Sequence, residues 1–402
     1  MRVLKQNPWL PSLGVLLAAV VAGGVARADV TTDEPGSIVI FPKVISDGTR
    51  DTLIQLTNTS TSAAHVHCVY IDTSTASPGT CSGTTPPAER CSIDADCVDP
   101  ATGNQNGVCI ICQESDFDFS LTPLQPTVWR VSTGRDSSDQ SNGIFLSQPP
   151  GVPPKPLFLG ELKCFQTDID GVPTGGNALK GEATLENIDN GQISEYNGIA
   201  IKAVNTTTVS PVCVGGQFDT LPCRTDTNCV HTTGTTDGVC RTILLLDNTT
   251  QYNACPTQLV VNHYSEGAED PFTGADVHSE LTLVPCTEDL AGATATSTTV
   301  RFAGFNEFEQ PVGLTGLSKI VPFTCWLNIG LDDPRLTFGF DRSTFGSTFG
   351  KTRVLPTSNS MSGVLGVLEE FHQGGTRDAT AAVNLHVIGA RPGDTITLPS
   401  GN

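Results

Sequence analysis

The chain has few basic residues, few aromatic residues and almost no methionine. Lysine and arginine together number 22 against 42 aspartates and glutamates, which gives a formal net charge of −20. Nucleic acids and anionic membrane surfaces are therefore not expected as partners, because binding to phosphates needs a basic surface. Only two methionines, beside 40 glycines and 27 prolines, argue against a bundle of helices.

Sequence motifs of several large enzyme classes are also missing. The chain contains no G-x-S-x-G, no H-E-x-x-H, no P-loop and no G-x-G-x-x-G. No known reaction is therefore indicated by a local motif. An enzyme would have to assemble its site from residues that lie far apart in the sequence.

Long hydrophobic runs are absent except near the N-terminus. Arg2 and Lys5 precede an apolar run over 13–25, and an A-x-A cleavage motif ends at Ala28. This pattern predicts a secretory signal peptide over 1–28, because the run is short for a membrane span. Its removal takes away three basic residues and no acid, so the net charge changes from −20 to −23. We expect a secreted, periplasmic or cell-surface protein without a membrane span.

Short alternating runs of Val, Ile, Thr, Leu and Phe, broken by Gly, Pro, Asn and Asp, make up most of the remaining chain. This alternation predicts β-strands. We expect strands over 37–41, 52–58, 64–71, 116–121, 127–132, 143–147, 157–167, 178–186, 198–204, 242–246, 258–263, 280–285, 298–305, 320–329 and 381–388. Their close spacing is typical of antiparallel sandwiches. The predicted fold is all-β, with two antiparallel Ig-like β-sandwich domains and two disulfide-stapled inserts.

We expect the first domain over 29–155, with a cysteine-rich insert at 73–111. The second domain is expected over 156–402, with an insert at 212–241. A proline-rich segment at 148–156 separates them. It is either a stiff linker, which we favour, or a long loop within one domain.

A faint internal repeat connects the two halves. Residues 38–58 resemble residues 281–306, since both run strand, proline, acidic turn and strand, with Pro42 matching Pro285. The similarity indicates either two related domains or the shared vocabulary of unrelated β-strands.

The cysteines, 14 in all, are even in number, as in a framework of disulfides in an oxidising compartment. Two stretches share intervals of nine and five residues between successive cysteines, and their third intervals are eleven and ten residues. Each set is expected to pair within itself, with its connectivity open. The two sets are Cys81, Cys91, Cys97 and Cys109, and Cys213, Cys223, Cys229 and Cys240.

The first insert carries C-x-x-D-x-D-C from Cys91 to Cys97 and then Gly-Val-Cys, and the second carries a close copy from Cys223. This pattern resembles the small cysteine-rich modules of exported bacterial surface proteins. It is also similar to the cysteine-rich domain at the N-terminus of Dickkopf proteins, which carry more cysteines. The resemblance covers about thirty residues per copy and implies a stapled module too small for its own core. The body resembles uncharacterised exported bacterial proteins, which implies no activity.

Six further cysteines lie in or beside predicted strands. Position favours the pairs Cys68–Cys112 and Cys255–Cys286, because each pair brackets a segment whose ends are expected to meet. Elimination then leaves Cys164–Cys325. A zinc site is the alternative, but the C-x-x-C that ends at Cys112 has no second C-x-x-C or histidine pair to complete it.

Two groups of residues are candidates for metal binding. His65 and His67 point to one face of a predicted strand, although no third ligand is indicated. Asp94 and Asp96 in the first insert suggest calcium, which prefers clustered oxygen ligands. The alternatives are a solvent-facing histidine pair and Asx-turns. No other cofactor is expected.

Two carboxylate pairs, Glu369-Glu370 and Asp332-Asp333, allow the hypothesis of glycoside hydrolysis, which needs two opposed carboxyl groups. In so acidic a chain, solvated surface carboxylates are the plainer interpretation. The predicted function is therefore non-catalytic binding, adhesion or surface architecture, with an extracellular protein or a glycan as partner. The alternative is a secreted hydrolase that acts on carbohydrate or peptide.

Overall fold

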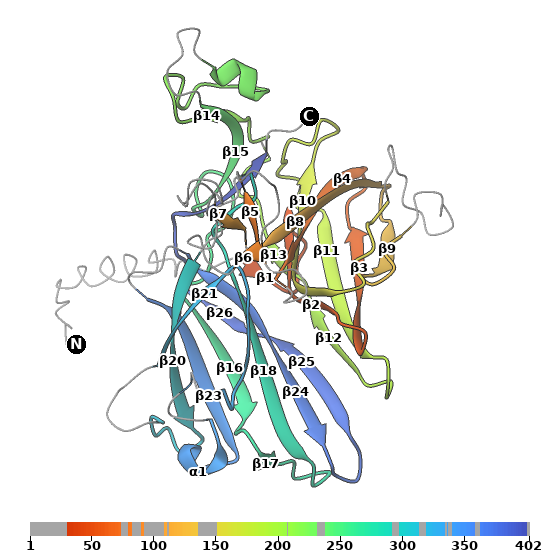
Figure 1. Ribbon diagram of the computed structural model, residues 1–402, viewed down its shortest axis with the longest axis vertical. Helices are drawn as coiled ribbons and strands as arrows, with labels where there is room; N and C mark the ends of the chain where they lie inside the picture. Colours follow the sequence, from red (N-terminus) through yellow and green to blue (C-terminus); the bar gives the residue numbers. More distant parts are fainter. Residues whose placement is uncertain are drawn as a thin grey trace, which may run out of the picture.

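The structure is a computed structural model, drawn in Figure 1. It describes residues 30–73, 79–82, 90–91, 108–110, 112–135, 151–206, 208–230, 238–291, 297–312, 319–333, 336, 340–357 and 362–399. Within these residues the fold is all-β, as the sequence predicts. The helical content of this part is one turn of 3-10 helix, η3 (Asp226–Cys229), and one turn of α-helix, α1 (Arg342–Phe345).

The N-terminal half forms a unit of two facing sheets, in red to yellow-green in Figure 1. Sheet A has the order β1 (Val30–Thr31), β13 (Ile199–Ile201), β2 (Ile38–Ser46), β10 (Phe158–Thr167), β4 (Ala64–Asp72) and β8 (Gln113–Leu121). Sheet B has the order β12 (Ile193–Asn197), β11 (Leu179–Asn187), β3 (Arg50–Asn58) and β9 (Pro126–Arg130). Side chains from both sheets, such as Phe41 and Tyr70 of sheet A and Leu56 of sheet B, share one buried core.

The C-terminal half forms a second unit of two facing sheets, in teal to blue in Figure 1. Sheet C has the order β21 (Lys319–Thr324), β20 (Ser297–Asn306), β23 (Phe349–Pro356), β16 (Gln258–Tyr264) and β26 (His386–Ile388). Sheet D has the order β17 (Ala268–Glu269), β18 (Asp276–Pro285), β24 (Val364–Gln373) and β25 (Ala379–Asn384), and β22 (Leu327–Gly330) also pairs with β18. Phe302 of sheet C and Leu281 of sheet D belong to their common core.

A fifth sheet covers the outer face of sheet A. Sheet E has the order β14 (Val212–Val214), β15 (Val239–Leu246), β27 (Asp394–Pro399) and β19 (Glu288–Asp289), and only β19 and β27 run parallel among the described strands. Ile38 and Ile40 of β2 pack there against Leu244 and Ile396. Sheet A is thus buried on both faces, which explains why all nine residues of β2 are buried.

The two units have the same strand order. Their strands, in chain order, are β2, β3, β4, β8, β9, β10, β11, β12 and β13 in the first unit and β16, β18, β20, β21, β22, β23, β24, β25 and β26 in the second. Numbered 1 to 9, both sets form one sheet of order 9-1-6-3-4 and one of order 8-7-2-5. Because the strand order is the same in both units, it supports an internal duplication. Residues 38–58 correspond in topology to 258–285, and not to 281–306, where the faint sequence repeat was seen.

The prediction of two Ig-like sandwich domains is wrong. The strands of the body form five small sheets, and the nine-strand order of the two units differs from the ABED and CFG sheets of an Ig domain. The expected boundary at residue 155 falls inside the first unit, because β10 and β11, which follow it, pair with β2 and β3. Alternation along a strand predicts a sheet, but it does not specify the neighbours of that strand.

The proline-rich segment is part of the first unit where it is described. Val152 is buried in the core of that unit, and Lys155 N donates a hydrogen bond to Val131 O. The segment is therefore a packed loop over these residues, and the prediction of a linker is wrong for them.

Three further strands link the described parts of the first insert: β5 (Gly79–Ser82), β6 (Arg90–Cys91) and β7 (Val108–Ile110). The second insert is joined to the body, since β15 continues from its last cysteine into sheet E. The described residues contain the disulfides Cys68–Cys164, Cys112–Cys325, Cys213–Cys229, Cys223–Cys240 and Cys255–Cys286.

The predicted Cys255–Cys286 bond is confirmed, and so is pairing within the second insert. The predicted bonds Cys68–Cys112 and Cys164–Cys325 are wrong. In the register of β4 and β8, Cys68 lies opposite Phe117, and Cys112 is five residues further along. At about 3.3 Å per residue this separates the two cysteines by about 17 Å, which is beyond the reach of a disulfide. Cys68 instead faces Cys164 across the sheet.

Candidate functional site

A cleft of about 410 Å³ lies where the two units meet. The first unit contributes the turn after β2 and the end of β11 with its hairpin. The second contributes β18, β24 and nearby loops. Polar and acidic side chains predominate in the lining, which consists of Thr49, Arg50, Leu185, Glu186, Asn187, Gln192, Glu266, His278, Ser279, Glu280, Gly330, Asp332, Glu369, Phe371, Gln373 and Thr380.

A buried lysine contacts two of the carboxylates that line this cleft. Lys43 of β2 is fully buried, and its Nζ lies 2.7 Å from Glu280 Oε2 and 2.7 Å from Glu369 Oε2. Both carboxylates belong to the second unit, so the contact joins the units. Arg50 Nη1 adds a second cation 3.4 Å from Glu280 Oε2. Ser194 Oγ donates a hydrogen bond of 2.7 Å to Glu369 Oε1.

The two cations determine the charge of Glu280. Burial by itself raises the pKa of this carboxyl, but Lys43 and Arg50 outweigh it and lower the pKa to about 2. Burial tends to lower the pKa of Arg50, and Glu280 and Glu369 outweigh it in turn, so that this pKa is raised. The centre of the cleft is therefore a set of fixed ion pairs.

Glu266 lies in the same cleft, but its pKa is shifted in the opposite direction to that of Glu280. Burial raises the pKa of its carboxyl, although hydrogen bonds from His278 and from Ser279 N act against the rise. Asp332, a further lining residue, raises it again by repulsion. The cleft therefore holds one carboxyl with a raised pKa, Glu266, and one with a lowered pKa, Glu280.

Further contacts hold the two units together around the cleft. Asn197 N donates a hydrogen bond of 3.0 Å to Asn384 Oδ1, and Asn384 Nδ2 donates one of 2.7 Å to Asn197 O. Trp326 Nε1 donates a hydrogen bond of 2.7 Å to Pro42 O, next to Lys43. With these contacts and the Lys43 ion pairs, the cleft is preformed.

The sequence candidates are only partly brought together. Glu369 and Asp332 line the cleft, whereas Glu370 on the opposite face of β24 accepts a hydrogen bond from Tyr264 N. The signal that was missed is a charged residue, Lys43, within the apolar run IVIFPKVIS of β2. A lysine inside a buried strand needs a buried acidic partner.

The histidine pair is not part of a described metal cluster. His65 and His67 share one face of β4, as predicted. His65 Nδ1 lies 2.6 Å from Ser120 Oγ, and His67 Nδ1 lies 2.9 Å from Asp118 Oδ1. Their ring nitrogens thus face side chains of the neighbouring strand β8. The calcium candidates Asp94 and Asp96 lie outside the described residues.

Two other groups of potential ligands lie close together, and both contain disulfide sulfurs. One consists of Cys213, Cys223 and Cys229, and the other of Cys255, Cys286 and Asp394. A disulfide sulfur is not the thiolate that binds metals.

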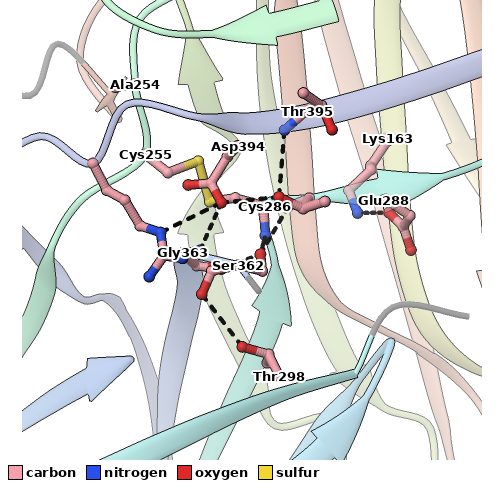
Figure 2. Close-up of a disulfide and its surroundings, with 12 residues drawn as sticks. Lys163, Ala254, Cys255, Cys286, Glu288, Thr298, Ser362, Gly363, Asp394 and Thr395 are labelled. Carbon is pink, nitrogen blue, oxygen red and sulfur yellow. Dashed lines mark hydrogen bonds and ion pairs between the residues drawn. A yellow bond between two sulfur atoms is a disulfide. The ribbon is translucent and has the colours of Figure 1, made fainter. Parts of the chain in front are cut away.

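Asp394, shown beside the Cys255–Cys286 bond in Figure 2, accepts hydrogen bonds from Gly363 N and Thr287 Oγ1. We interpret the group of Cys255, Cys286 and Asp394 as a structural element that stabilises the fold, and not as a metal site.

Comparison with known proteins gives no family. No family model and no curated protein matches this chain. One solved structure, the viral chemokine-binding protein R17 of rodent gammaherpesvirus Peru, aligns over 86% of this chain and 88% of its own, with 11% identity and a TM-score of 0.13. A similarity at this level carries no argument about fold or function.

Disulfides within the described residues are compatible with a secreted or extracellular protein. Among those same residues, no helix has the length and apolar character of a membrane span.

Proposed function

We propose that this protein is an exported, non-catalytic binding protein that holds a glycan in the cleft between its two units. The observation that carries the proposal is the cleft itself, which both units build and their contacts preform. Its volume lies within the range of about 300–1,000 Å³ that is common for small-ligand sites. Preformed sites bind well because little conformational freedom is lost on association.

The lining favours a ligand rich in hydroxyl groups. Gln373 offers a donor and an acceptor. The side-chain amides of Asn187 and Gln192 offer N–H donors, because their oxygens already accept hydrogen bonds within the hairpin. Phe371 provides an aromatic ring. A sugar needs this combination, since its hydroxyls both donate and accept hydrogen bonds. The negative net charge of the chain is consistent with a neutral or amino sugar and disfavours acidic glycans.

A glycan array probed with the oxidised mature protein tests this proposal. We expect binding to neutral or amino glycans, and Gln192→Ala or Gln373→Ala should weaken it at least tenfold. Gln217→Ala, an exposed position in the second insert, is the matched control and should bind like the unmodified protein. Absence of binding, or equal binding by the cleft variants, would contradict the proposal.

A secreted hydrolase is the second candidate, and one observation favours it. Glu266 and Glu280 have pKa values shifted in opposite directions within one cleft, which is how acid and base roles are separated in many hydrolases. Chromogenic glycosides and peptides test it directly. Turnover that is lost in both Glu266→Gln and Glu280→Gln would replace the binding function by hydrolysis.

A further inference from the structure

A second buried lysine lies between sheets A and E. Lys163 of β10 is fully buried, and its Nζ contacts two buried carboxylates. Glu161 of the same strand places Oε1 3.0 Å from Nζ, and Glu288 of β19 places Oε2 in direct contact with it. Figure 2 shows Lys163 pointing at Glu288.

Apolar residues flank Lys163 and Glu161 on the neighbouring strands of sheet A. Lys163 lies between Ile40 and Val69 in the register of sheet A, and Glu161 lies beside Ile71. All three neighbours are buried in the core that sheets A and E share. Within the described residues, no donor reaches Glu161 Oε2.

Burial opposes the charges of Lys163 and Glu161. Burial lowers the pKa of Lys163, although Glu161 acts against the change. It raises the pKa of Glu161, although Lys163 acts against that change. Nearby Glu114 of β8 has its pKa raised to about 8, first by burial and then by repulsion from Asp116 and Asp289. Burial therefore shifts the pKa values of Lys163 and Glu161 towards their neutral forms, and a neutral amine is the form that attacks a carboxyl carbon.

We propose that Lys163 Nζ and Glu288 Cδ are joined by a self-formed amide bond, with Glu161 as the proton carrier. The proposal is independent of the glycan-binding function. It rests on the contact between Lys163 Nζ and the Glu288 carboxyl group, on the burial of both side chains, and on a second carboxyl, Glu161, whose Oε2 accepts no hydrogen bond from the described residues. Held in contact, the two groups react as parts of one molecule, which removes the entropic barrier to their encounter.

The chemistry balances without a further reactant. The amine lone pair of Lys163 attacks Glu288 Cδ and forms the C–N bond. Glu161 takes a proton from Nζ and delivers it to the leaving oxygen of Glu288. The C–O bond then breaks, one water molecule leaves, and Glu161 returns to its initial state. The reaction removes the charges of Lys163 and Glu288 from an apolar region. Charges that are imperfectly paired there cost free energy of folding.

Lys43 provides an internal comparison. It also contacts two carboxylates, but Glu280 is 31% exposed to the cleft, and Arg50 and Asn328 also contact Glu280. These contacts favour the ionised carboxylate, which is not an acylating group. We therefore expect Lys43 to remain in ion pairs while Lys163 reacts.

Mass spectrometry of the intact, reduced and denatured mature protein tests the proposal. We expect a mass lower than that of the sequence by one water molecule, and a digest should contain a branched peptide that joins Lys163 to Glu288. Glu161→Gln should restore the full mass while the disulfide pattern stays unchanged. Lys43→Met should keep the lower mass.

If a variant fails to fold, the mass and the digest of the unmodified protein still test the proposal. A full mass and separate Lys163 and Glu288 peptides in that protein would overturn the proposal. A lower mass with the branch at Lys43 would overturn the assignment to Lys163. An unchanged crosslink in Glu161→Gln would overturn the role of Glu161.

Discussion

Cys112 and Cys325, which are 213 residues apart in the sequence, are joined by a disulfide that links the first unit to the second. Cys112 directly precedes β8 of sheet A, and Cys325 lies between β21 of sheet C and β22 of sheet D. The bond therefore acts together with the Lys43 ion pairs, which also join the units.

Loss of this bond is the first prediction. In the chain-entropy model a loop of this length contributes about 5 kcal/mol, against about 4 kcal/mol for the 31-residue separation of Cys255–Cys286. Cys112→Ser with Cys325→Ser should thus lower the melting temperature more than Cys255→Ser with Cys286→Ser. Calorimetry of both double variants at equal pH measures the difference. A smaller loss from the Cys112–Cys325 pair would contradict the expected order.

Lys43→Met is expected to destabilise the protein strongly. The side chain of Glu369 is only 3% exposed and would lose its nearest cation, a change that costs about 3–5 kcal/mol for buried pairs. Urea denaturation measures the free energy of unfolding. Adding Glu369→Leu should recover part of the loss, because it removes the unpaired charge. Lys202→Met, which breaks the exposed pair with Glu34, is the control and should change little.

Acid should weaken the fold through His263. Burial lowers the pKa of this imidazole to about 4, while its backbone hydrogen bond to Tyr264 acts against the change. Because the unfolded chain binds the proton more readily, stability is complete above pH 6.5 and is lost as the pH falls towards 4. The contribution is roughly 3 kcal/mol.

The measurement for His263 is the free energy of unfolding at pH 7 and pH 5. His263→Gln should flatten the difference between the two values, whereas His386→Gln, at an exposed position, should preserve it. Equal pH dependence in both variants would show that other groups are responsible.

Connectivity in the first insert is expected to follow that of the second. The second insert joins its first cysteine to its third and its second to its fourth. Cys81 lies opposite Cys109 in the register of the first insert, as Cys213 lies opposite Cys240 in the second. Disulfide mapping should therefore find Cys81–Cys97 and Cys91–Cys109, although Cys97 lies outside the described residues. Any bond between the two inserts would disprove this assignment.

Export with cleavage after Ala28 is the last prediction. The basic start, the short apolar run and the A-x-A motif carry it. N-terminal sequencing of the exported product should begin at Asp29. A mature protein that begins at Met1 would rule it out.

Strand positions could be predicted well where alternation is strong, as for β3, β4, β10 and β11. They were missed where glycine and charged residues interrupt the pattern, as in β23, whose sequence is FGKTRVLP. The sequence SGVLGVLEEFH at 362–372 fits either a short helix or a bulged strand, and the structure places most of β24 there. Gly366 of this strand packs against the backbone of Thr282. Such close approach requires glycine, and its reason is visible only when the neighbouring strand is known.

The candidate site shows the same limit. Glu369 was noticed as part of an acidic pair, but its partners Lys43 and Arg50 lie more than 200 residues away in the sequence. No local pattern connects such residues. They meet because the first unit packs on β18 and β24 of the second.

The sequence by itself determined the all-β class, the acidic surface and the pairing of the second insert within itself, because periodicity and cysteine spacing are local properties. Only the tertiary structure decided the five sheets, the Cys68–Cys164 and Cys112–Cys325 bonds, the cleft and the burial of Lys43 and Lys163. The physical reason is that strand order in a sheet, and hence every contact between distant segments, is selected by the packing of whole faces and not by the alternation within one strand.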